Sequence, residues 1–293
     1  MTPSPPPSSS PQASPSSGRT ALPLVALDLD KTLIFSARSL HLPTDVPAPE
    51  LVEVERLDGA PLSFATAREL HLLAELDRAA VVVPVTTRTL AQYRRVDLGL
   101  RPRFAIAANG GHVLVDGTPD PDWAAAVADA VAAACAPLAE MLVLAERFAA
   151  PGWARTVRAA DDLFVYLVAH ERPAIPDLTE FAADAAAAGW AVSMQGRKVY
   201  LVPSLLTKQR AVDEVARRAG TGLRLAAGDS VLDIPMLLAA DAAVRPAHGE
   251  LHELGWTAPQ VSVTTAVGGL AGEELCELLL ARVRGATADV RPG

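Results

Sequence analysis

The fold is decided by the stretch LPLVALDLDKT, residues 22–32. Its apolar run, Leu22–Leu27, predicts a buried strand, and two carboxylates, Asp28 and Asp30, follow two positions apart where the strand ends. Two like charges this close are costly unless a cation or a strongly polar partner compensates them. Proteins of the α/β class commonly place their chemistry at the carboxyl ends of strands. The stretch therefore predicts either a functional site or an acidic turn, and the remaining motifs decide between them.

The composition narrows the classes of function. The 293 residues suffice for one large domain or two modest ones, and half of them are hydrophobic, which allows a sizeable core. The net charge of -8 and the scattered cationic residues argue against nucleic acid as a partner. The two cysteines, Cys135 and Cys276, lie far apart and predict neither a disulfide framework nor a metal-binding pair.

The two ends of the chain are predicted to lie outside the folded part. Residues 1–20 are mostly Pro and Ser, which predicts a disordered tail rather than a signal peptide. Residues 284–293 are predicted to form a C-terminal tail. Charges interrupt the longest apolar stretches well before membrane-spanning length, so we expect no membrane partner and a cytoplasmic protein.

Strand-like and helix-like segments alternate after the first tail, which predicts a Rossmann-like parallel α/β sheet. A hairpin is predicted from Leu51–Leu57, a turn at Asp58-Gly59 and a return through Leu62–Phe64, and a helix from Ala67–Arg78. The predicted core strands are Leu22–Leu27, Ala80–Val85, Phe104–Ala107, Leu223–Ala227 and Ala242–Val244.

The pattern of predicted helices and strands changes from about residue 119 to 202. One long helix is predicted over about Trp123–Phe148 and a second over about Pro176–Ala188, and each is followed by two strands. The four strands are predicted at Ala154–Ala159, Leu163–His170, Ala191–Gln195 and Lys198–Val202. This doubled helix-strand-strand pattern predicts an α+β domain, residues 119–202, inserted between two parts of the core, residues 21–118 and 203–283.

Four motifs fall where they can meet at one edge of the predicted sheet. The first is the pair Asp28 and Asp30, the second is TTR at residues 86–88, the third is Lys208 at a helix start, and the fourth is GDSVLD at residues 228–233. All except Lys208 directly follow apparent parallel strands, so they converge on one crevice. Carboxylates suit Mg²⁺, which takes few protein ligands beside water and phosphate. A hydroxyl and an ammonium group donate to phosphate oxygens.

This order of motifs resembles the haloacid dehalogenase (HAD) superfamily of phosphatases and phosphotransferases. The letters AANGG, Ala107–Gly111, resemble the segment after the third core strand in its sugar-phosphatase branch. The insert between TTR and Lys208 resembles the type 2 cap of sucrose-phosphate, mannosyl-3-phosphoglycerate and Cof-like phosphatases. The resemblance spans residue 21 to about residue 283 and implies a HAD core with an inserted type 2 cap.

The resemblance also implies a role for each motif residue. Asp28 would attack phosphorus and form an aspartyl-phosphate. Asp30 would protonate the leaving alcohol and then accept a proton from the hydrolytic water. A threonine of TTR and Lys208 would bind the transferring phosphoryl group. The implied ligands of Mg²⁺ are Asp28, the backbone carbonyl of Asp30, Asp229 and, directly or through water, Asp233.

Three letters depart from the sugar-phosphatase pattern. Lys31 stands where that branch usually has Gly, and Leu232 stands where it commonly has an Asn that helps to orient the metal site. Thr87 replaces the usual Gly after the hydroxyl residue, so either Thr86 or Thr87 serves as the phosphate donor, and the alignment of TTR favours Thr86. These departures leave open whether activity or Mg²⁺ affinity is reduced.

Other candidates for substrate contact have equally simple structural explanations. Asn109 and Gly110 either line the substrate site or form a turn. Arg197 and Lys198, between the last two strands of the insert, either contact an anionic substrate or form a solvated turn. His112 lies near the predicted crevice, where we expect a turn or surface role for it.

The sequence thus predicts a Mg²⁺-dependent phosphatase acting on a small phosphorylated metabolite, plausibly a sugar phosphate. The alternatives are a phosphomutase or phosphotransferase of the same superfamily, and a phosphate-binding regulatory protein with weakened turnover. Substrate identity is left open because loops of the cap decide it. Monomer and homodimer are both compatible with the sequence.

Overall fold

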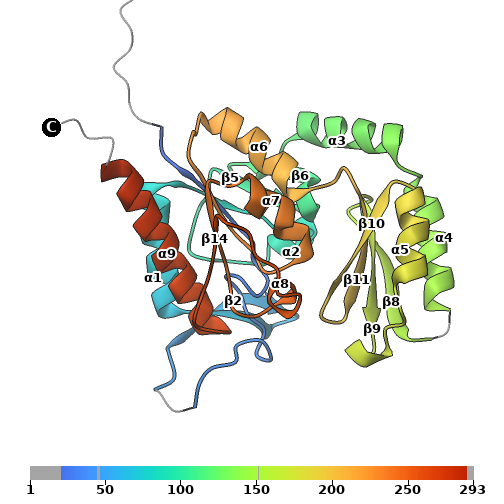
Figure 1. Cartoon of the computed structure of the whole chain (residues 1–293), viewed down its shortest axis with the longest axis horizontal. Helices are drawn as coiled ribbons and strands as arrows, with labels where there is room; N and C mark the ends of the chain where they lie inside the picture. The colour runs from blue at the N-terminus through green and yellow to red at the C-terminus, as the bar shows by residue number, and fades with distance from the viewer. Residues whose placement is uncertain (1–20, 45–46, 151, 289–293) are drawn as a thin grey trace, which may run out of the picture.

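The computed structural model describes residues 21–44, 47–150 and 152–288, with a parallel sheet at the centre of the larger domain (Figure 1). Five strands form this sheet in the order β14-β13-β12-β1-β4, and every neighbouring pair is parallel. Their bounds are Leu24–Leu27 (β1), Val81–Pro84 (β4), Arg224–Ala227 (β12), Ala242–Arg245 (β13) and Val261–Val263 (β14). The predicted α/β core is confirmed, and β14 is a strand that the sequence prediction lacked.

The central strand β1 is covered on both faces. Leu24 and Ala26 belong to the hydrophobic cluster built on α6 and α7, whereas Val25 and Leu27 belong to the cluster built on α1 and α9. These helices run over Ala67–Ala79 (α1), Lys208–Ala219 (α6), Ile234–Ala239 (α7) and Gly269–Ala288 (α9). Successive side chains of a strand point to opposite faces. The unbroken apolar run before Asp28 is therefore what a strand buried between two helical layers requires.

The predicted hairpin is confirmed as β2 (Leu51–Leu57) and β3 (Ala60–Thr66), which pair antiparallel. Its turn residues Asp58 and Gly59 both have positive φ, 51° and 80°, as a tight two-residue hairpin turn requires. A bridge between Phe35 and Phe64 joins the hairpin to the loop that follows β1. The hairpin therefore lies beside the DLDKT motif.

The segment Phe104–Ala107 (β5) was predicted to be a core strand, and it sits at the border of the parallel sheet. It pairs antiparallel with β6 (His112–Val115), which in turn pairs with β7 (Thr118–Pro119). A single parallel bridge between Val85 and Ile106 connects it to the extension of β4. The short loop from β5 to β6 explains the antiparallel pairing, because parallel neighbours need a longer crossover.

The insert forms a separate antiparallel sheet in the order β10-β11-β9-β8, to the right of the core in Figure 1. Its elements are α3 (Pro121–Ala134), α4 (Leu138–Ala149), β8 (Ala154–Ala160), β9 (Phe164–Ala169), α5 (Thr179–Ala187), β10 (Trp190–Gln195) and β11 (Lys198–Pro203). Helices α4 and α5 pack on one face of this sheet, through side chains such as Met141 and Phe181. The opposite face, which carries Tyr166 and Tyr200 at paired positions, is turned toward the core. The predicted α+β cap is confirmed.

The long helix predicted over about Trp123–Phe148 is wrong, because two helices occupy this stretch. α3 ends before Cys135 and α4 starts after Pro137, and their axes are bent by 68°. Proline disfavours helical backbone in the residue before it, which is Ala136. The N–H of Ala136 instead donates to Ala188 O, and the indole N–H of Trp190 donates to Ala136 O. The break therefore lets the segment before α4 form hydrogen bonds with the end of α5 and the start of β10.

The last helix is longer than expected, since α9 continues to Ala288 and includes the first residues of the predicted C-terminal tail. The predicted tail of residues 1–20, and residues 289–293, lie outside the described residues. Within the described ranges, no single helix is long and apolar enough to cross a membrane, although α3 and α4 together pass that test as a bent pair.

Candidate active site

The DLDKT motif forms a tight turn at the carboxyl end of β1. The N–H of Asp28 donates to Ala227 O, and Thr32 Oγ1 donates to Asp28 Oδ2 at 3.0 Å. Lys31 has a φ of 61°, a left-handed backbone conformation that costs a lysine more than a glycine. The turn leaves the Asp28 side chain almost completely buried and the Asp30 side chain half exposed. The two carboxylates of the motif therefore occupy different environments.

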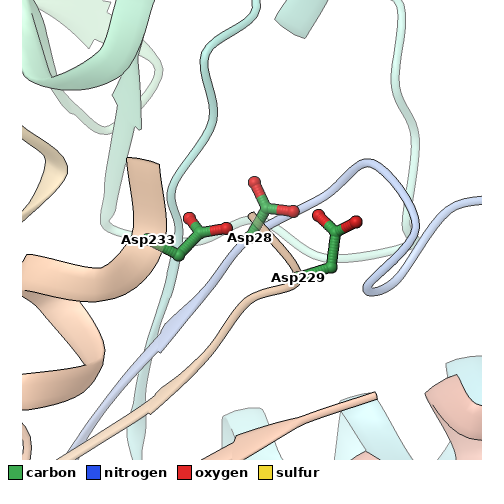
Figure 2. Close-up of side chains that lie close together, drawn as sticks. All are labelled: Asp28, Asp229 and Asp233. Atoms are coloured by element: carbon green, nitrogen blue, oxygen red, sulfur yellow. The ribbon is translucent and has the colours of Figure 1, made fainter. Parts of the chain in front are cut away.

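The fourth motif brings two further carboxylates next to Asp28 (Figure 2). Asp229 follows β12, and Asp233 ends the short helix η3 (Val231–Asp233). One oxygen of each of the three carboxylates lies within 4.8 Å of the others. The backbone N–H and the hydroxyl of Ser230 both donate to Asp233 Oδ2, at 2.9 and 2.7 Å, and this fixes the carboxylate.

Lys208 is the cation of this cluster. Its Nζ lies 2.5 Å from Asp28 Oδ1 and 2.5 Å from Asp233 Oδ1, and the whole side chain is buried. It occupies the first position of α6, where Thr207 caps the helix by accepting the N–H of Arg210. The ends of β1, β12 and α6 thus converge on one buried charge cluster, as the motif order predicted.

The AANGG segment forms a turn that packs against the start of α6. Asn109 is buried, and its Nδ2 donates to Leu206 O at 2.7 Å. A Cβ at Gly110 would lie 2.3 Å from Thr207 O, so only glycine permits this approach. Neither residue lines the cavity described below. The turn therefore positions Lys208, and contact of Asn109 or Gly110 with a substrate stays a prediction.

The carboxylates of the cluster carry more negative charge than Lys208 compensates. Burial raises the pKa of Asp28 to about 7, because the opposing effect of Lys208 is smaller and Asp233 adds to the rise. Burial, with Asp28 and Asp233, holds the pKa of Asp229 well above its usual range. A divalent cation relieves such repulsion, and hard oxygen ligands are the donors that Mg²⁺ prefers. The buried set Asp28, Asp229 and Asp233 therefore fits a metal of this kind.

Arg88, the last letter of TTR, holds Asp30. Its Nε and Nη2 donate to the two carboxylate oxygens at 2.7 and 2.8 Å, and its Nη1 lies 2.8 Å from Oε1 of the buried Glu55. Burial alone would raise the pKa of Asp30, but the hydrogen bonds and charge of Arg88 lower it. Arg95 and Ser63 also contact Glu55. The sequence prediction assigned no role to Arg88 or Glu55, although an arginine directly after a core strand was a visible signal.

The two threonines of TTR are placed differently. Thr86 is fully buried, and its Oγ1 accepts the N–H of Arg88 at 3.1 Å. The preceding residue, Val85, donates to Leu27 O, so Thr86 lies beside the DLDKT turn. Thr87 instead lines a narrow crevice with Phe164 of the cap. Of the two threonines of TTR, Thr86 is therefore the one that lies beside the DLDKT turn.

A cavity of about 410 Å³ lies between core and cap at this site. Asp30 and Asp229 line it from the core, and Arg197 and Lys198 line it from the cap. Further lining residues are Lys31, Ile34, Ser36, Ser39, Leu62, Ser63, Arg88, Val168, Gln195 and Tyr200. The predicted cap residues thus face the same space as Asp30 and Asp229, whereas Asp28 is not among the lining residues.

Polar contacts also join the cap to the core through residues that do not line the cavity. Asp161, in the turn between β8 and β9, accepts the backbone N–H of Leu90 at 2.8 Å and lies 3.5 Å from His112 Nε2. Arg172 forms an ion pair with Glu253 at 2.5 Å. His112 is therefore partly buried at the contact between the two domains and does not line the cavity.

No protein-family model matches the sequence, and no curated protein matches it. A sucrose-phosphatase from Synechocystis sp. PCC6803, solved with sucrose and phosphate, superposes with a TM-score of 0.63 at 16% identity, covering 90% of this chain and 99% of its own. A haloacid dehalogenase-like hydrolase from B. subtilis gives 0.53 at 16% identity, covering 87% and 99%. A HAD subclass IIB sugar phosphatase gives 0.56 at 13% identity, covering 89% and 98%. These likenesses show that the chain has the fold of HAD-superfamily hydrolases, cap included.

Proposed function

We propose that this chain, which has the HAD fold, is a Mg²⁺-dependent phosphatase that hydrolyses a small phosphorylated metabolite through an aspartyl-phosphate on Asp28. One observation carries the proposal. Asp28 is buried beside Lys208, Asp229 and Asp233, and Asp229 also lines, with Asp30, a cavity large enough for a small metabolite. The solved structures with this fold include phosphatases described as acting on sucrose phosphate and sugar phosphates, which supports a sugar phosphate as substrate.

Asp28 has the surroundings that a nucleophilic carboxylate requires. Thr32 Oγ1 holds one of its oxygens and Lys208 the other, so the side chain has a single orientation. The carboxylate attacks phosphorus, the bond to the leaving oxygen breaks, and the phosphoryl group is transferred to Asp28. Lys208 and the Thr86 hydroxyl stabilise charge on the phosphoryl oxygens, which is the main requirement of phosphoryl transfer.

Asp30 is the general acid and base of the proposal. Its half-exposed carboxylate lines the cavity, where it can give a proton to the leaving oxygen and later take one from the attacking water. The bidentate contact with Arg88 fixes its direction. Because Arg88 also lowers the pKa of Asp30, the carboxylate is prepared chiefly for the second step, in which it accepts a proton.

Mg²⁺ would be held by Asp28, Asp229 and the backbone carbonyl of Asp30, with Asp233 in support. When bound, it supplies positive charge that neutralises the carboxylates and draws electron density from the phosphoryl group. Asp233 is already engaged by Ser230 and Lys208, which fits a supporting role for this residue.

The proposal is tested by phosphate release from a panel of phosphorylated sugars and sugar acids. The purified protein is assayed with Mg²⁺ and again with a chelator in excess. We expect release from at least one ester with Mg²⁺ and its loss with the chelator. Release that is equal under both conditions, or none from any panel member, would contradict the proposal.

A further inference from the structure

Three lysines occur among the 26 cationic residues of the chain, and all three lie at the proposed site. Lys208 is buried against Asp28 and Asp233. Lys31 and Lys198 line the cavity, from the core and the cap respectively. The protein otherwise uses arginine for positive charge. Lysine is a compact ammonium with three donors, which suits contact with an anionic ligand from different directions.

The site already contains the charges that phosphoryl transfer needs. Lys208 neutralises carboxylates of the buried cluster, and Arg88 is paired with Asp30 and Glu55. Lys31, Arg197 and Lys198 are additional. Among the described residues, none of these three forms an ion pair with a carboxylate within 4.0 Å. The cavity therefore carries three cationic groups without a paired carboxylate in the described part of the chain, although the charge of Lys31 acts to lower the pKa of Asp229 and that of Lys198 the pKa of Asp30.

The ammonium group of Lys198 lies near two aromatic rings and is not paired with an acid in the described part of the chain. Its Nζ lies 5.9 Å from the centre of the Tyr200 ring and 6.0 Å from that of Tyr166. Both rings belong to the cap face that looks toward the core. The side chain of Tyr200 interacts with the ammonium group and raises the pKa of Lys198, so the group keeps its positive charge without an acidic partner within 4.0 Å among the described residues. Arg197, next in the chain, donates only to the backbone carbonyl of His170, at 3.2 Å.

Lys31 occupies a position that a glycine would fill at lower cost. Its φ of 61° places a lysine in the left-handed region, where a Cβ is unfavourable. Backbone contacts hold this conformation, since the N–H of Lys31 donates to Ile34 O and its carbonyl lies 2.8 Å from His248 Nε2. The side chain of Lys31 lines the cavity next to Asp229.

We infer that the substrate carries a second anionic group, a carboxylate or a further phosphate, on the part that leaves, and that Lys31, Arg197 and Lys198 bind it. The inference rests on the proposed phosphatase function of the same site and specifies its substrate class. Phosphate esters of uncharged sugars are then poorer substrates than phosphorylated sugar acids or bisphosphates.

The test compares esters that differ only in the second charge. The pairs are 6-phosphogluconate with sorbitol 6-phosphate and 3-phosphoglycerate with glycerol 3-phosphate. Binding to the Asp28→Asn protein with Mg²⁺ is measured by calorimetry, because turnover would otherwise consume the ligand. We expect the acidic member of at least one pair to bind about tenfold more tightly, the effect of one charge-assisted hydrogen bond. Adding Lys198→Gln should remove most of that ratio.

Arg155→Gln is the matched control, since Arg155 is an exposed cation of the cap strand β8 that does not line the cavity. It removes one charge and should leave the ratio intact. Equal affinities within both pairs, or no binding of either acidic ester, would overturn the inference. Phosphate release from neutral esters alongside equal affinities would leave the proposed function standing without the second anion site. Tight binding of the acidic esters with no release from any ester would support the second anion site and contradict the proposed phosphatase function.

The scarcity of lysine provides a second readout that does not depend on turnover. Acetylation of the folded Asp28→Asn protein, followed by peptide mass mapping, reports separately on Lys31, Lys198 and the buried Lys208. With 6-phosphogluconate present we expect Lys198 to be protected at least threefold more than with sorbitol 6-phosphate. Equal protection by the two esters at saturation would contradict direct contact between Lys198 and the second anion.

Discussion

The cations that surround Asp28 and Asp30 in the core differ from Lys198 of the cap in their partners. In the core, Lys208 lies between Asp28 and Asp233, and Arg88 lies between Asp30 and Glu55. In the cap, Lys198 contacts tyrosine rings and has no acidic partner within 4.0 Å in the described part of the chain. Fixed partners give a side chain one geometry before substrate binds. A cation without an acidic partner gains one only when an anionic ligand binds. We infer from this difference that the proposed chemistry belongs to the core and the choice of substrate to the cap.

The largest effect is expected from Lys208→Met, which tests the core side of this comparison. Phosphate release should fall at least about a hundredfold, since Lys208 is proposed to bind the phosphoryl group. The free energy of unfolding should also fall, by about 3–5 kcal/mol, because removing one partner leaves buried carboxylates uncompensated. Denaturant titration measures this loss. Because Asp28 has a pKa raised to about 7, its protonation should make the loss smaller at pH 5 than at pH 8.

Arg155→Met is the control for that experiment, since it removes an exposed cation from the cap. It should change neither phosphate release nor the free energy of unfolding appreciably. Equal effects of the two substitutions would show that Lys208 has no special role.

A smaller effect is expected from Arg88→Lys, which keeps the charge beside Asp30 and removes the two-pronged contact. We expect kcat to fall about tenfold with a small change in KM, because the general acid and base loses its fixed direction. Arg95→Lys is the matched control, because Arg95 contacts Glu55 without touching Asp30. If both variants lost kcat equally, the contact between Arg88 and Asp30 would not be the cause.

Metal binding should depend on pH through the buried carboxyls. Their folded pKa values are raised, to about 7 for Asp28 from 3.8, so the native chain holds protons that the unfolded chain releases. Without metal, stability therefore falls as pH rises between these two values. Mg²⁺ must displace those protons, so its stabilising shift in Tm should be larger at pH 8 than at pH 5.5. A shift that is the same at both pH values would argue against these ligands.

The smallest effect is expected from Arg172→Gln, which breaks the ion pair between cap and core at Glu253. Both side chains are about half exposed, so we expect a change in unfolding free energy of less than about 1 kcal/mol. Thermal unfolding and kcat/KM measure the outcome. A loss of activity above about tenfold would mean that this ion pair holds the cap in place and that the cap takes part in more than substrate choice.

Local patterns predicted most of the fold. The apolar run before Asp28 and the Asp58-Gly59 turn specified a buried strand and a hairpin, and both are confirmed. The prediction of one helix from Trp123 failed because Pro137 breaks an otherwise helical composition. Strand β14, only three residues long, carries too little periodicity to be recognised.

The sequence predicted those parts of the candidate site whose motifs directly follow strands. The placement of Asp229 and Asp233 beside Asp28 followed from the convergence of parallel strands. The role of Glu55 did not, because it depends on the hairpin meeting Arg88, a contact between distant segments. The role of AANGG in seating Lys208 depends likewise on the approach of Gly110 to Thr207, which no single segment shows.

Asp28→Asn tests whether Asp28 is the nucleophile of the core. The amide has nearly the shape of the carboxylate and cannot attack phosphorus. Phosphate release is measured for both proteins with saturating Mg²⁺ on the best ester of the panel. We expect release to fall by about a thousandfold or more in the variant. Turnover equal to that of the unsubstituted chain would show that Asp28 is not the nucleophile.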